Sequence, residues 1–386
     1  MAQSRPPRFA WSRMLRQGVK CAKCVALLVA LAAATARMLV AAEAARDEST
    51  TVDATSAKTA SATPLTLYRG KYPGWPWICR TPGGKLVCVW REGDRHNFSS
   101  TGKMMLTESD DQGVTWTTPR TFYDEPGIDD RNNAILALSD NEWLVNFNTF
   151  TSEGVSRTMT LRTRNAGKSW EGPYLVCDQD ARTRAAVVRL STGELVMPFY
   201  RGGGEIALAG ISTDGGSRWD VVEVPNAPGY MGDEWDLCEL ADGRLIGILR
   251  NNAPQGGGWF YKTQSTDRGR TWSTPVKTNL RDRRATSPAQ IFLHEGRPVV
   301  LYSDARMVSV VMAISDDPNF VEWQVDQRHP CYRYRADGQP IVDGSYPVSV
   351  PVGPSKRFVV DYFHNGDDHL ITGRFVDLPA AWSERR

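Results

Sequence analysis

The sequence predicts an all-β protein, a six-bladed β-propeller built from four-stranded antiparallel blades. The first observation is an eight-residue pattern, S-x-D-x-G-x-T-W, that recurs with tryptophans 49 to 54 residues apart. The second is a series of hairpin-like apolar runs that keep the same phase as this pattern. The third is a C-terminal remainder with three strand-like runs and no copy of the pattern. A repeat of about 50 residues made of strands and tight turns is typical of propellers or solenoids.

The repeated pattern is best preserved at residues 265–272, which read STDRGRTW. Asp can hydrogen-bond backbone N–H groups two or three residues on, Gly supplies a positive φ, and Ser or Thr adds further turn bonds. The tryptophan is expected to pack flat against the neighbouring blade. We therefore predict that Asp111, Asp214 and Asp267 hold turns and do no catalysis. Close copies occupy 109–116 and 212–219, a looser copy occupies 163–170, and a decayed fifth runs from Ser315 to Trp323.

A hairpin signal precedes each copy by about 30 residues: an apolar run, a turn pair and a second apolar run. Each unit therefore holds two hairpins, or four strands. The sixth unit has only three strand-like runs, so its fourth strand is expected from residues 65–68, at the other end of the domain. Such a strand would close the ring and remove free sheet edges. The units start near Trp75, Asp130, Arg184, Glu234, Thr286 and Ser345.

The first 44 residues predict a signal peptide or an N-terminal anchor. Six Lys and Arg residues precede an uncharged apolar run at 24–36, and small residues offer an A-x-A-like cleavage site at 42–44. The run is shorter than the roughly 20 residues needed to span a bilayer, which favours a cleaved signal. Residues 45–63 are expected to be a flexible tether and 64–380 one closed domain. We expect a secreted or periplasmic protein, attached to a membrane only if the N-terminal segment stays uncleaved.

Composition excludes several partners and cofactors. The formal net charge is +2 over 386 residues, and the basic residues are scattered, so no nucleic-acid partner is expected. Cleavage of the signal would leave five cysteines, an odd number that gives no disulfide framework. Cys79 and Cys88 would face each other across a two-residue Gly83-Gly84 loop, either bridged or, as is commoner, as buried free thiols. No CxxC or HExxH spacing suggests a metal, and no cofactor is expected.

The strand ends opposite the repeated turns are unusually polar. Blade starts and the ends of second strands carry charges of both signs, which should converge on the mouth of the central channel. Several arginines in one cleft imply a carboxylate ligand, since guanidinium groups pair bidentately with carboxylates. The alternative is that these charges pair with one another as loop ion pairs. Candidates for contacts to substrate from this set include Asp130, Arg131, Arg250 and Arg306.

The repeated pattern resembles the Asp-box of the sialidase superfamily, and further residues match that family. A family hairpin of the form E-x-x-x-x-E-L-x-D-G-x-L, with an Arg ending its second strand, matches residues 234–245 and Arg250. The third family Arg matches Arg306, and a Ser-Tyr pair opening the last blade matches Tyr346. The resemblance implies an exo-α-sialidase-like glycosidase acting on a glycan with a carboxylate. Tyr346 would be the nucleophile, Glu234 its base, and Arg250 and Arg306 the carboxylate clamp.

The residue types suit that chemistry. A sialidase cleaves a ketoside next to a carboxylate, which would repel an Asp or Glu nucleophile. A neutral Tyr deprotonated towards a nearby Glu avoids this repulsion, and such enzymes are exceptions among glycosidases with two carboxylates.

Two departures from the family pattern leave alternatives open. Gly74 stands where the family has its first Arg, so Arg80, Arg131 or Arg184 would have to replace it. The general acid would be Asp94, but His96 lies in the same segment and is well suited to proton transfer near neutral pH. A site with His96 could act on another acidic sugar, such as a uronic acid, by hydrolysis or β-elimination. A non-catalytic glycan-binding propeller is the remaining alternative.

Overall fold

The computed structural model describes residues 63–284, 286–326, 330–379 and 382. Residues Ala60–Arg386 form one compact unit. The predicted signal or anchor, and the predicted tether up to residue 62, lie outside the described residues. Their boundaries and the expected export therefore stay predictions.

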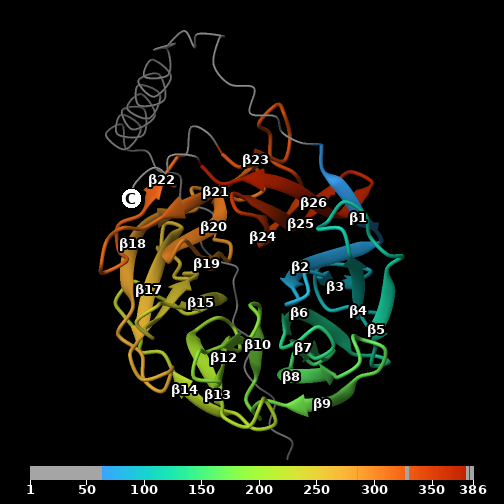
Figure 1. The fold of residues 1–386 in the computed structure, drawn as a ribbon, viewed down its shortest axis with the longest axis horizontal. Helices are drawn as coiled ribbons and strands as arrows, with labels where there is room; N and C mark the ends of the chain where they lie inside the picture. The colour runs from blue at the N-terminus through green and yellow to red at the C-terminus, as the bar shows by residue number, and fades with distance from the viewer. Residues whose placement is uncertain (1–62, 285, 327–329, 380–381, 383–386) are drawn as a thin grey trace, which may run out of the picture. The chain divides into compact units, whose positions relative to one another are not determined.

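Six antiparallel sheets surround a common centre (Figure 1), which confirms the predicted six-bladed propeller. In the first, second and fourth blades, successive strands of the chain are neighbours, as expected for two hairpins per unit, and the third and fifth blades each hold one further short strand that pairs outside this order. The first two blades are β2 (Tyr72–Arg80), β3 (Leu86–Gly93), β4 (Lys103–Ser109) and β5 (Arg120–Tyr123), then β6 (Asp129–Ala137), β7 (Trp143–Phe150), β8 (Ser156–Thr163) and β9 (Glu171–Leu175). The next two are β10 (Ala181–Thr183), β11 (Val188–Arg189), β12 (Leu195–Arg201), β13 (Ile206–Ser212) and β14 (Asp220–Glu223), then β15 (Trp235–Glu239), β16 (Leu245–Leu249), β17 (Trp259–Ser265) and β18 (Val276–Arg281). The fifth holds β19 (Gln290–His294), β20 (Arg297–Ala305), β21 (Ser309–Ile314), β22 (Gln324–Val325) and β23 (Tyr332–Arg333).

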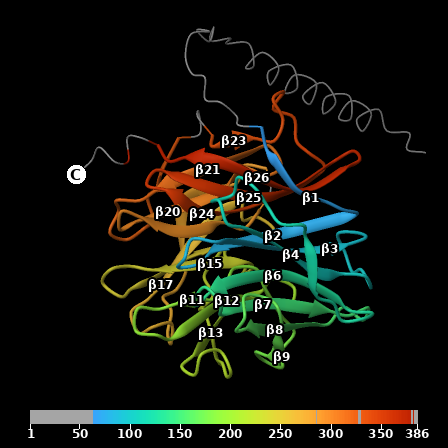
Figure 2. The ribbon, with the colours of Figure 1, turned by 45° about the vertical axis from the view of Figure 1, so that its right-hand side comes forward.

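The last blade joins the two ends of the described chain. It contains β24 (Asp343–Gly353), β25 (Lys356–Asn365) and β26 (Asp368–Asp377), and β1 (Leu65–Arg69) supplies its fourth strand by pairing with β26. Figures 1 and 2 both show β1 beside β26 at the rim of the ring. The predicted closure by residues 65–68 is therefore confirmed.

The innermost strand of the third blade is interrupted. Both β10 and β11 pair with β12, but the residues between them do not. Ala185 and Val187 among them instead bond to the buried Asn146 side chain of the second blade. Its amide nitrogen donates to Thr183 Oγ1 and to the carbonyl of Ala185, and its amide oxygen accepts from Val187 N. This break leaves β10 as a short strand that ends just before Arg184.

The repeated turns have the hydrogen bonds predicted from their residue types. In the first copy, Asp111 accepts bonds from Thr115 N and from Ser109 Oγ, each at 2.8 Å. Gly113 N donates in turn to Ser109 Oγ. Hydrogen bonds from Thr115, more than any other influence, lower the pKa of Asp111 to about 2. The copy at 265–272 repeats these contacts.

The tryptophans of these turns pack between blades, although not flat as predicted. The Trp116 ring lies 5.4 Å from Phe358 of the last blade with 36° between the planes. Trp170 stands at 37° to Phe122 of the preceding blade, whereas Trp272 meets Trp235 of its own blade edge-on at 90°. Tilted and edge-on pairs match the charge distribution of aromatic rings better than a face-to-face stack.

The register of the first hairpin corrects one expectation. Thr81 N bonds Lys85 O and Gly84 N bonds Thr81 O, so three residues rather than two form the loop. Cys79 therefore pairs with Val87, and Cys88 pairs with Ile78. The five described cysteines are all free thiols. Burial raises the pKa of Cys79 to about 12, which keeps it protonated.

Candidate active site

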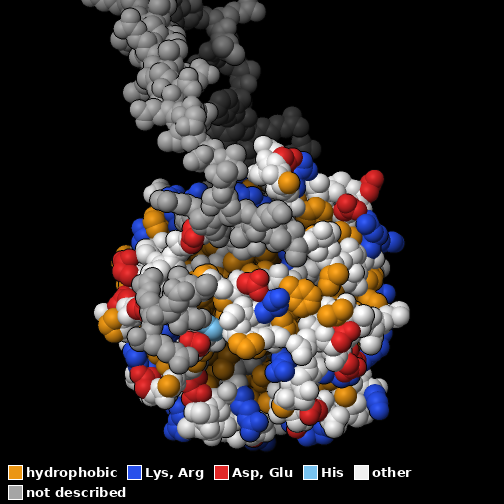
Figure 3. Space-filling view, turned by 45° about the horizontal axis from the view of Figure 1, so that its top comes forward, with side chains coloured by type: hydrophobic (Ala, Val, Ile, Leu, Met, Phe, Trp, Pro, Cys, Tyr) orange, Lys and Arg blue, Asp and Glu red, His pale blue; other side chains and the backbone are white. Residues whose placement is uncertain are grey.

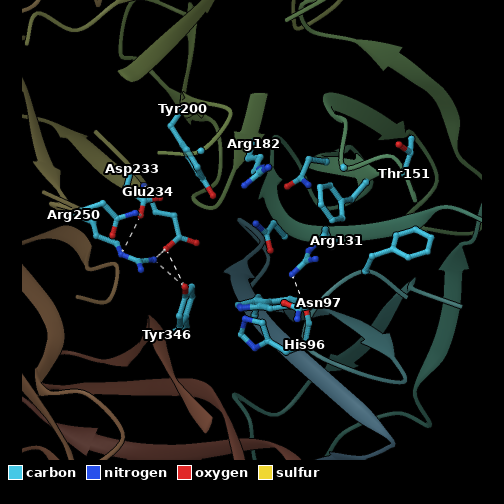
Figure 4. A pocket seen from close by; sticks show the side chains of 18 of the residues that line it. His96, Asn97, Arg131, Thr151, Arg182, Tyr200, Asp233, Glu234, Arg250 and Tyr346 are labelled. Atoms are coloured by element: carbon cyan, nitrogen blue, oxygen red, sulfur yellow. Dashed lines mark hydrogen bonds and ion pairs between the residues drawn. The ribbon is translucent and has the colours of Figure 1, made fainter. Parts of the chain in front are cut away.

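A cavity of about 530 Å³ opens where the innermost strands begin and the second strands end, and all six blades contribute to its walls. Its volume is within the ~300–1,000 Å³ typical of ligand pockets. Figure 4 shows its side chains pointing inwards from opposite sides. The cavity is lined by Trp75, His96, Asn97, Phe98, Arg131, Asn132, Asn148, Phe150, Thr151, Ser152, Gly154, Arg182, Tyr200, Gly203, Asp233, Glu234, Arg250, Asn252, Arg306 and Tyr346.

Tyr346 is held in the cavity wall by a distorted stretch of β24. Ser345 and Tyr346 have φ values of 87° and 68°, and the pairing with β25 shifts register after Ser345. Consecutive positive φ values at non-glycine residues are unfavourable and are typically retained at functional sites. The Tyr346 side chain is buried, and only 5% of the residue is exposed. The bulge thus fixes the direction of this one hydroxyl.

Tyr346, Glu234 and Arg250 form a hydrogen-bonded group (Figure 4). The Tyr346 hydroxyl donates to Glu234 Oε2 at 3.0 Å, and Arg250 Nη1 donates to the same hydroxyl at 3.1 Å. Arg250 also pairs with Glu234, and its Nε lies 3.3 Å from Asp233 Oδ2. Burial and the Glu234 charge raise the pKa of Tyr346 to about 12, although Arg250 and Arg306 act to lower it. The hydroxyl therefore keeps its proton until a base removes it, and Glu234 is positioned to do so.

Arg306 approaches Tyr346 from the fifth blade. Its guanidinium carbon lies 5.6 Å from the centre of the Tyr346 ring, and its Nη1 donates to Thr286 O at 3.2 Å. Nη2 lies 3.8 Å from Asp343 Oδ1, and the buried Nε has no hydrogen-bond partner among the described residues. Arg250 and Arg306 thus flank the tyrosine, and Arg306 retains a free donor.

His96, and not Asp94, faces the cavity. His96 Nδ1 lies 2.8 Å from Asp343 Oδ2 and 3.0 Å from the hydroxyl of Tyr72. Burial alone would raise the pKa of Asp343, but hydrogen bonds from His96 and Tyr72 bring it below the usual value, so this carboxylate is charged. Asp94 is exposed and pairs with Arg95 at 2.8 Å.

Arg131 lines the cavity and lies against two aromatic rings. Its guanidinium carbon lies 4.3 Å from the Trp75 ring centre and 5.6 Å from that of Phe150, within cation–π range. Trp75 has a φ of 52° beside Gly74, where the pairing of β2 with β3 shifts register. A Cβ built on Gly74 would meet no atom within 4 Å, so a side chain there would have space.

Three other candidates do not line the cavity. Arg80 is the last residue of the nine-residue strand β2, which begins at the cavity end. Asp130 is buried in β6, where its carboxylate accepts a bond from Glu125 N at 2.8 Å. Arg184 is buried, with its guanidinium carbon 5.0 Å from the ring centres of Trp77 and Tyr346.

Several cavity residues were not selected from the sequence. Trp75, Phe150, Tyr200 and Asp233 lack a matching family motif, yet each lies at a blade start or at the end of a second strand. Their position in the repeat was the available signal, but aromatic residues at those positions also fit an ordinary strand. Asp233 could have been selected because it directly precedes Glu234.

No group of three or more His, Cys, Asp or Glu residues that could hold a metal ion occurs in the described part of the chain. Within the same residues, no helix is long and apolar enough to cross a membrane. On the face shown in Figure 3, Lys and Arg side chains are interspersed with Asp and Glu rather than gathered in one large patch.

Comparisons with known proteins agree with the fold. A family model described as a BNR repeat-like domain matches residues 84–349. A protein of unknown function from Dyadobacter fermentans superposes with a TM-score of 0.70 at 18% identity, covering 82% of this chain and 98% of the other. A leech intramolecular trans-sialidase complexed with 2,7-anhydro-Neu5Ac gives 0.66 at 10% identity, covering 82% and 70% of the two chains. The intramolecular trans-sialidase of Ruminococcus gnavus gives 0.64 at 11% identity, covering 81% and 96%.

A search among curated protein sequences found no match. The family model nevertheless spans well over half of the chain, and its range includes the Asp-boxes together with Glu234, Arg250, Arg306 and Tyr346. The chain is therefore a member of the BNR repeat-like domain family, and it shares its β-propeller fold with the two trans-sialidases.

Proposed function

We propose that this protein is a glycoside hydrolase that releases a terminal acidic sugar from glycans. The observation that carries the proposal is the 3.0 Å hydrogen bond from the Tyr346 hydroxyl to Glu234, inside a cavity lined by four arginines. The combination supplies a neutral nucleophile, its base and partners for a carboxylate. The fold shared with sialidases supports this reaction class.

In the proposed reaction, Tyr346 Oη attacks the anomeric carbon while its proton moves to Glu234. The bond from the anomeric carbon to the leaving oxygen breaks, and that oxygen takes a proton from a general acid. Water then attacks the anomeric carbon and gives a proton to the deprotonated general acid, the tyrosyl–sugar bond breaks, and Glu234 returns its proton to Tyr346. Arg250, 3.1 Å from the tyrosine hydroxyl, stabilises the developing phenolate. With Arg306 it would bind the substrate carboxylate.

His96 is the better candidate for the general acid. It lines the cavity and Asp343 orients its Nδ1, whereas Asp94 is not among the lining residues and is paired with Arg95. An imidazole held by a carboxylate is a common arrangement for proton transfer.

Hydrolysis of a fluorogenic sialoside by the purified protein tests the proposal. Tyr346→Phe should lower kcat by about 10³-fold or more, because the nucleophilic oxygen is lost while the ring remains. Glu234→Gln should lower kcat by about 10²- to 10⁴-fold through loss of the base. Both variants should keep the wild-type circular dichroism spectrum. Undiminished turnover in Tyr346→Phe would exclude the proposed nucleophile.

A second candidate function is supported by the His96–Asp343 pair. With Arg131 and Arg306 to bind a carboxylate, His96 could serve a hydrolase or lyase acting on a uronic-acid sugar. A panel of uronic-acid glycans, with products followed by mass spectrometry and by absorbance of a new double bond, distinguishes the two. Turnover of uronides alone, abolished in His96→Ala, would favour this second function. Tight glycan binding without turnover of any substrate would indicate a binding propeller.

We also infer export, from the basic and apolar segments within residues 1–44 and the A-x-A-like cleavage site. N-terminal sequencing of the protein recovered outside the cytoplasm would locate the cleavage site. Recovery of an uncleaved chain in the membrane fraction would instead favour an N-terminal anchor.

A further inference from the structure

Arginines line the cavity on two sides. One, the Tyr346 side, contains Tyr346, Glu234, Arg250 and Arg306. The other, which we call the Arg182 side, contains Arg182, Arg131 and Phe150. In Figure 4, Arg182 and Arg131 lie across the cavity from Arg250 and Tyr346. The proposed reaction uses the Tyr346 side together with His96 as the general acid, so the Arg182 side has no role in it.

The Arg182 side chain makes no hydrogen bond or ion pair to any residue that the structure describes. Its guanidinium carbon lies 5.4 Å from the Phe150 ring centre, and its Nε is buried without a partner. It projects from β10, beside the broken inner strand, where it pairs in register with Tyr200. Buried or half-buried arginines normally find an acceptor, so an unmatched one marks a place for a ligand.

The neighbouring charges leave this side of the cavity short of acidic groups. Arg91 and Arg131 share a single carboxylate, that of Asp129, which accepts two bonds from Arg91 at 2.9 Å and lies 3.4 Å from Arg131. Burial lowers the pKa of Arg131, and the charges of Arg91 and Arg182 act in the same direction. The three guanidinium groups therefore repel one another. Among the described residues, Asp129 is the one carboxylate in ion-pair contact with any of them, although the charges of Arg182 and Asp233 also interact at longer range.

An anionic ligand group would relieve this repulsion. Arg182 offers free N–H donors. The Phe150 ring lies within cation–π distance of both its guanidinium and that of Arg131. Planar guanidinium groups bind carboxylates and sulfates through paired hydrogen bonds, which are stronger when the site is partly desolvated. A sugar that carries only one acid group, bound at Arg250 and Arg306, would leave Arg182 unmatched.

We propose that the substrate is a polyanionic glycan, in which the sugar next to the cleaved residue carries a second anionic group bound by Arg182 and Arg131. This inference rests on the proposed function, since it takes the Tyr346 side as the site of cleavage. The second group is a carboxylate or a sulfate. The cavity then selects glycans whose acidic residues are adjacent.

Calorimetric binding to the Tyr346→Phe variant, in which turnover is blocked, tests the proposal. N-acetylneuraminic acid and its α2,8-linked dimer provide one and two carboxylates. Sialyllactose with and without a sulfate on its galactose provides the sulfate comparison. We expect one of the dianionic ligands to bind about tenfold more tightly than its monoanionic counterpart, equivalent to ~1.4 kcal/mol. The pair with the larger difference identifies the second anion.

Adding Arg182→Leu should remove this advantage and leave the affinity for the monoanionic ligand within about twofold. Arg182→Lys, which keeps the charge, should retain part of it, and Arg189→Leu, which removes an exposed charge from the same blade, should retain all of it. Equal weakening of both ligands in Arg182→Leu would overturn the proposal, because Arg182 would then belong to the first carboxylate site. So would the absence of any dianionic preference.

If sialic-acid ligands do not bind, galacturonic acid and its dimer replace them in the same comparison, and failure with all pairs overturns the proposal. Tighter binding of the dianionic ligand that depends on Arg182 would support the second anion site even if the wild-type protein shows no glycosidase turnover. The absence of turnover would then reject only the proposed hydrolysis. Turnover of monoanionic sialosides without any dianionic preference would do the reverse.

Discussion

The two ends of this propeller use the same residue types for opposite purposes. We call the end with the repeated Asp-box turns the box end, and the end with the cavity the pocket end. At the box end, Asp267 accepts hydrogen bonds from Ser265 Oγ, Thr271 N and Thr271 Oγ1, at 2.7 to 2.9 Å. At the pocket end, Glu234 contacts Arg250 and Tyr346, which come from two different blades. The acids at the box end bond within their own turn, whereas those at the pocket end depend on residues about 16 to 112 positions away.

This contrast explains why one end is structural and the other can be chemical. A turn whose carboxylate is satisfied by adjacent backbone has nothing left to offer a ligand. At the pocket end, Arg182 Nε and Arg306 Nε are buried without partners among the described residues, and the Tyr346 backbone is strained. Unused donors and strained backbone cost stability and are retained where function needs them.

The largest effect is expected from removing the central arginine of the pocket end. Arg250→Leu would leave Glu234 and Asp233 buried without their ion-pair partner, since their side chains are only 4% and 5% exposed. Loss of one partner from a buried ion pair typically costs ~3–5 kcal/mol. We expect a fall of that size in the free energy of unfolding, measured in urea, together with loss of turnover.

A matched double variant separates the two losses. Arg250→Leu combined with Glu234→Gln should recover part of the stability, because one unpaired charge is gone, but no activity. If Arg250→Leu alone proves as stable as the wild type, the pocket end does not depend on long-range pairing and the contrast with the box end fails.

At the box end, a substitution should lower the free energy of unfolding without lowering the activity. Asp267→Ala removes three hydrogen bonds within one turn and should lower the free energy of unfolding by ~2 kcal/mol. Because the turn lies away from the cavity, kcat/KM of the folded protein should stay within about twofold of wild type. The exposed Asp220→Ala serves as the control and should change neither quantity. A large fall in kcat/KM at unchanged stability would show that the box end contributes to the site.

The sequence predicted those features that depend on neighbouring residues. The turn at 265–272 is encoded by eight consecutive residues. The sixth unit shows only three strand-like runs, so its fourth strand was expected from residues 65–68. Tyr346, Glu234 and Arg250 were selected because their local motifs match a known family, and the structure brings them together.

Features that depend on strand irregularities were not predictable from the sequence. The pairing of β6 with β7 shifts register between Arg131 and Ala134, and nothing in the local pattern says which residue faces the cavity. Asp130 is buried away from it, while Arg131 lines it. Similarly, His96 in the loop after β3 lines the cavity, whereas Asp94, only two positions earlier, does not.

The smallest predicted effect concerns Asp130, which tests whether this residue belongs to the structure rather than the site. Burial raises the pKa of its carboxyl from 3.8 to about 7, and Oδ1 is buried without a partner. Between about pH 4 and 7 the folded protein therefore holds a proton that the unfolded chain has released, so the free energy of unfolding falls as pH rises through that window. Asp130→Asn removes the titration and can keep the bond from Glu125 N, so it should be more stable than wild type by ~1 kcal/mol at pH 8 and by less at pH 5. Thermal unfolding at both pH values measures this, and substrate affinity should not change. Weaker substrate binding in this variant would return Asp130 to the site.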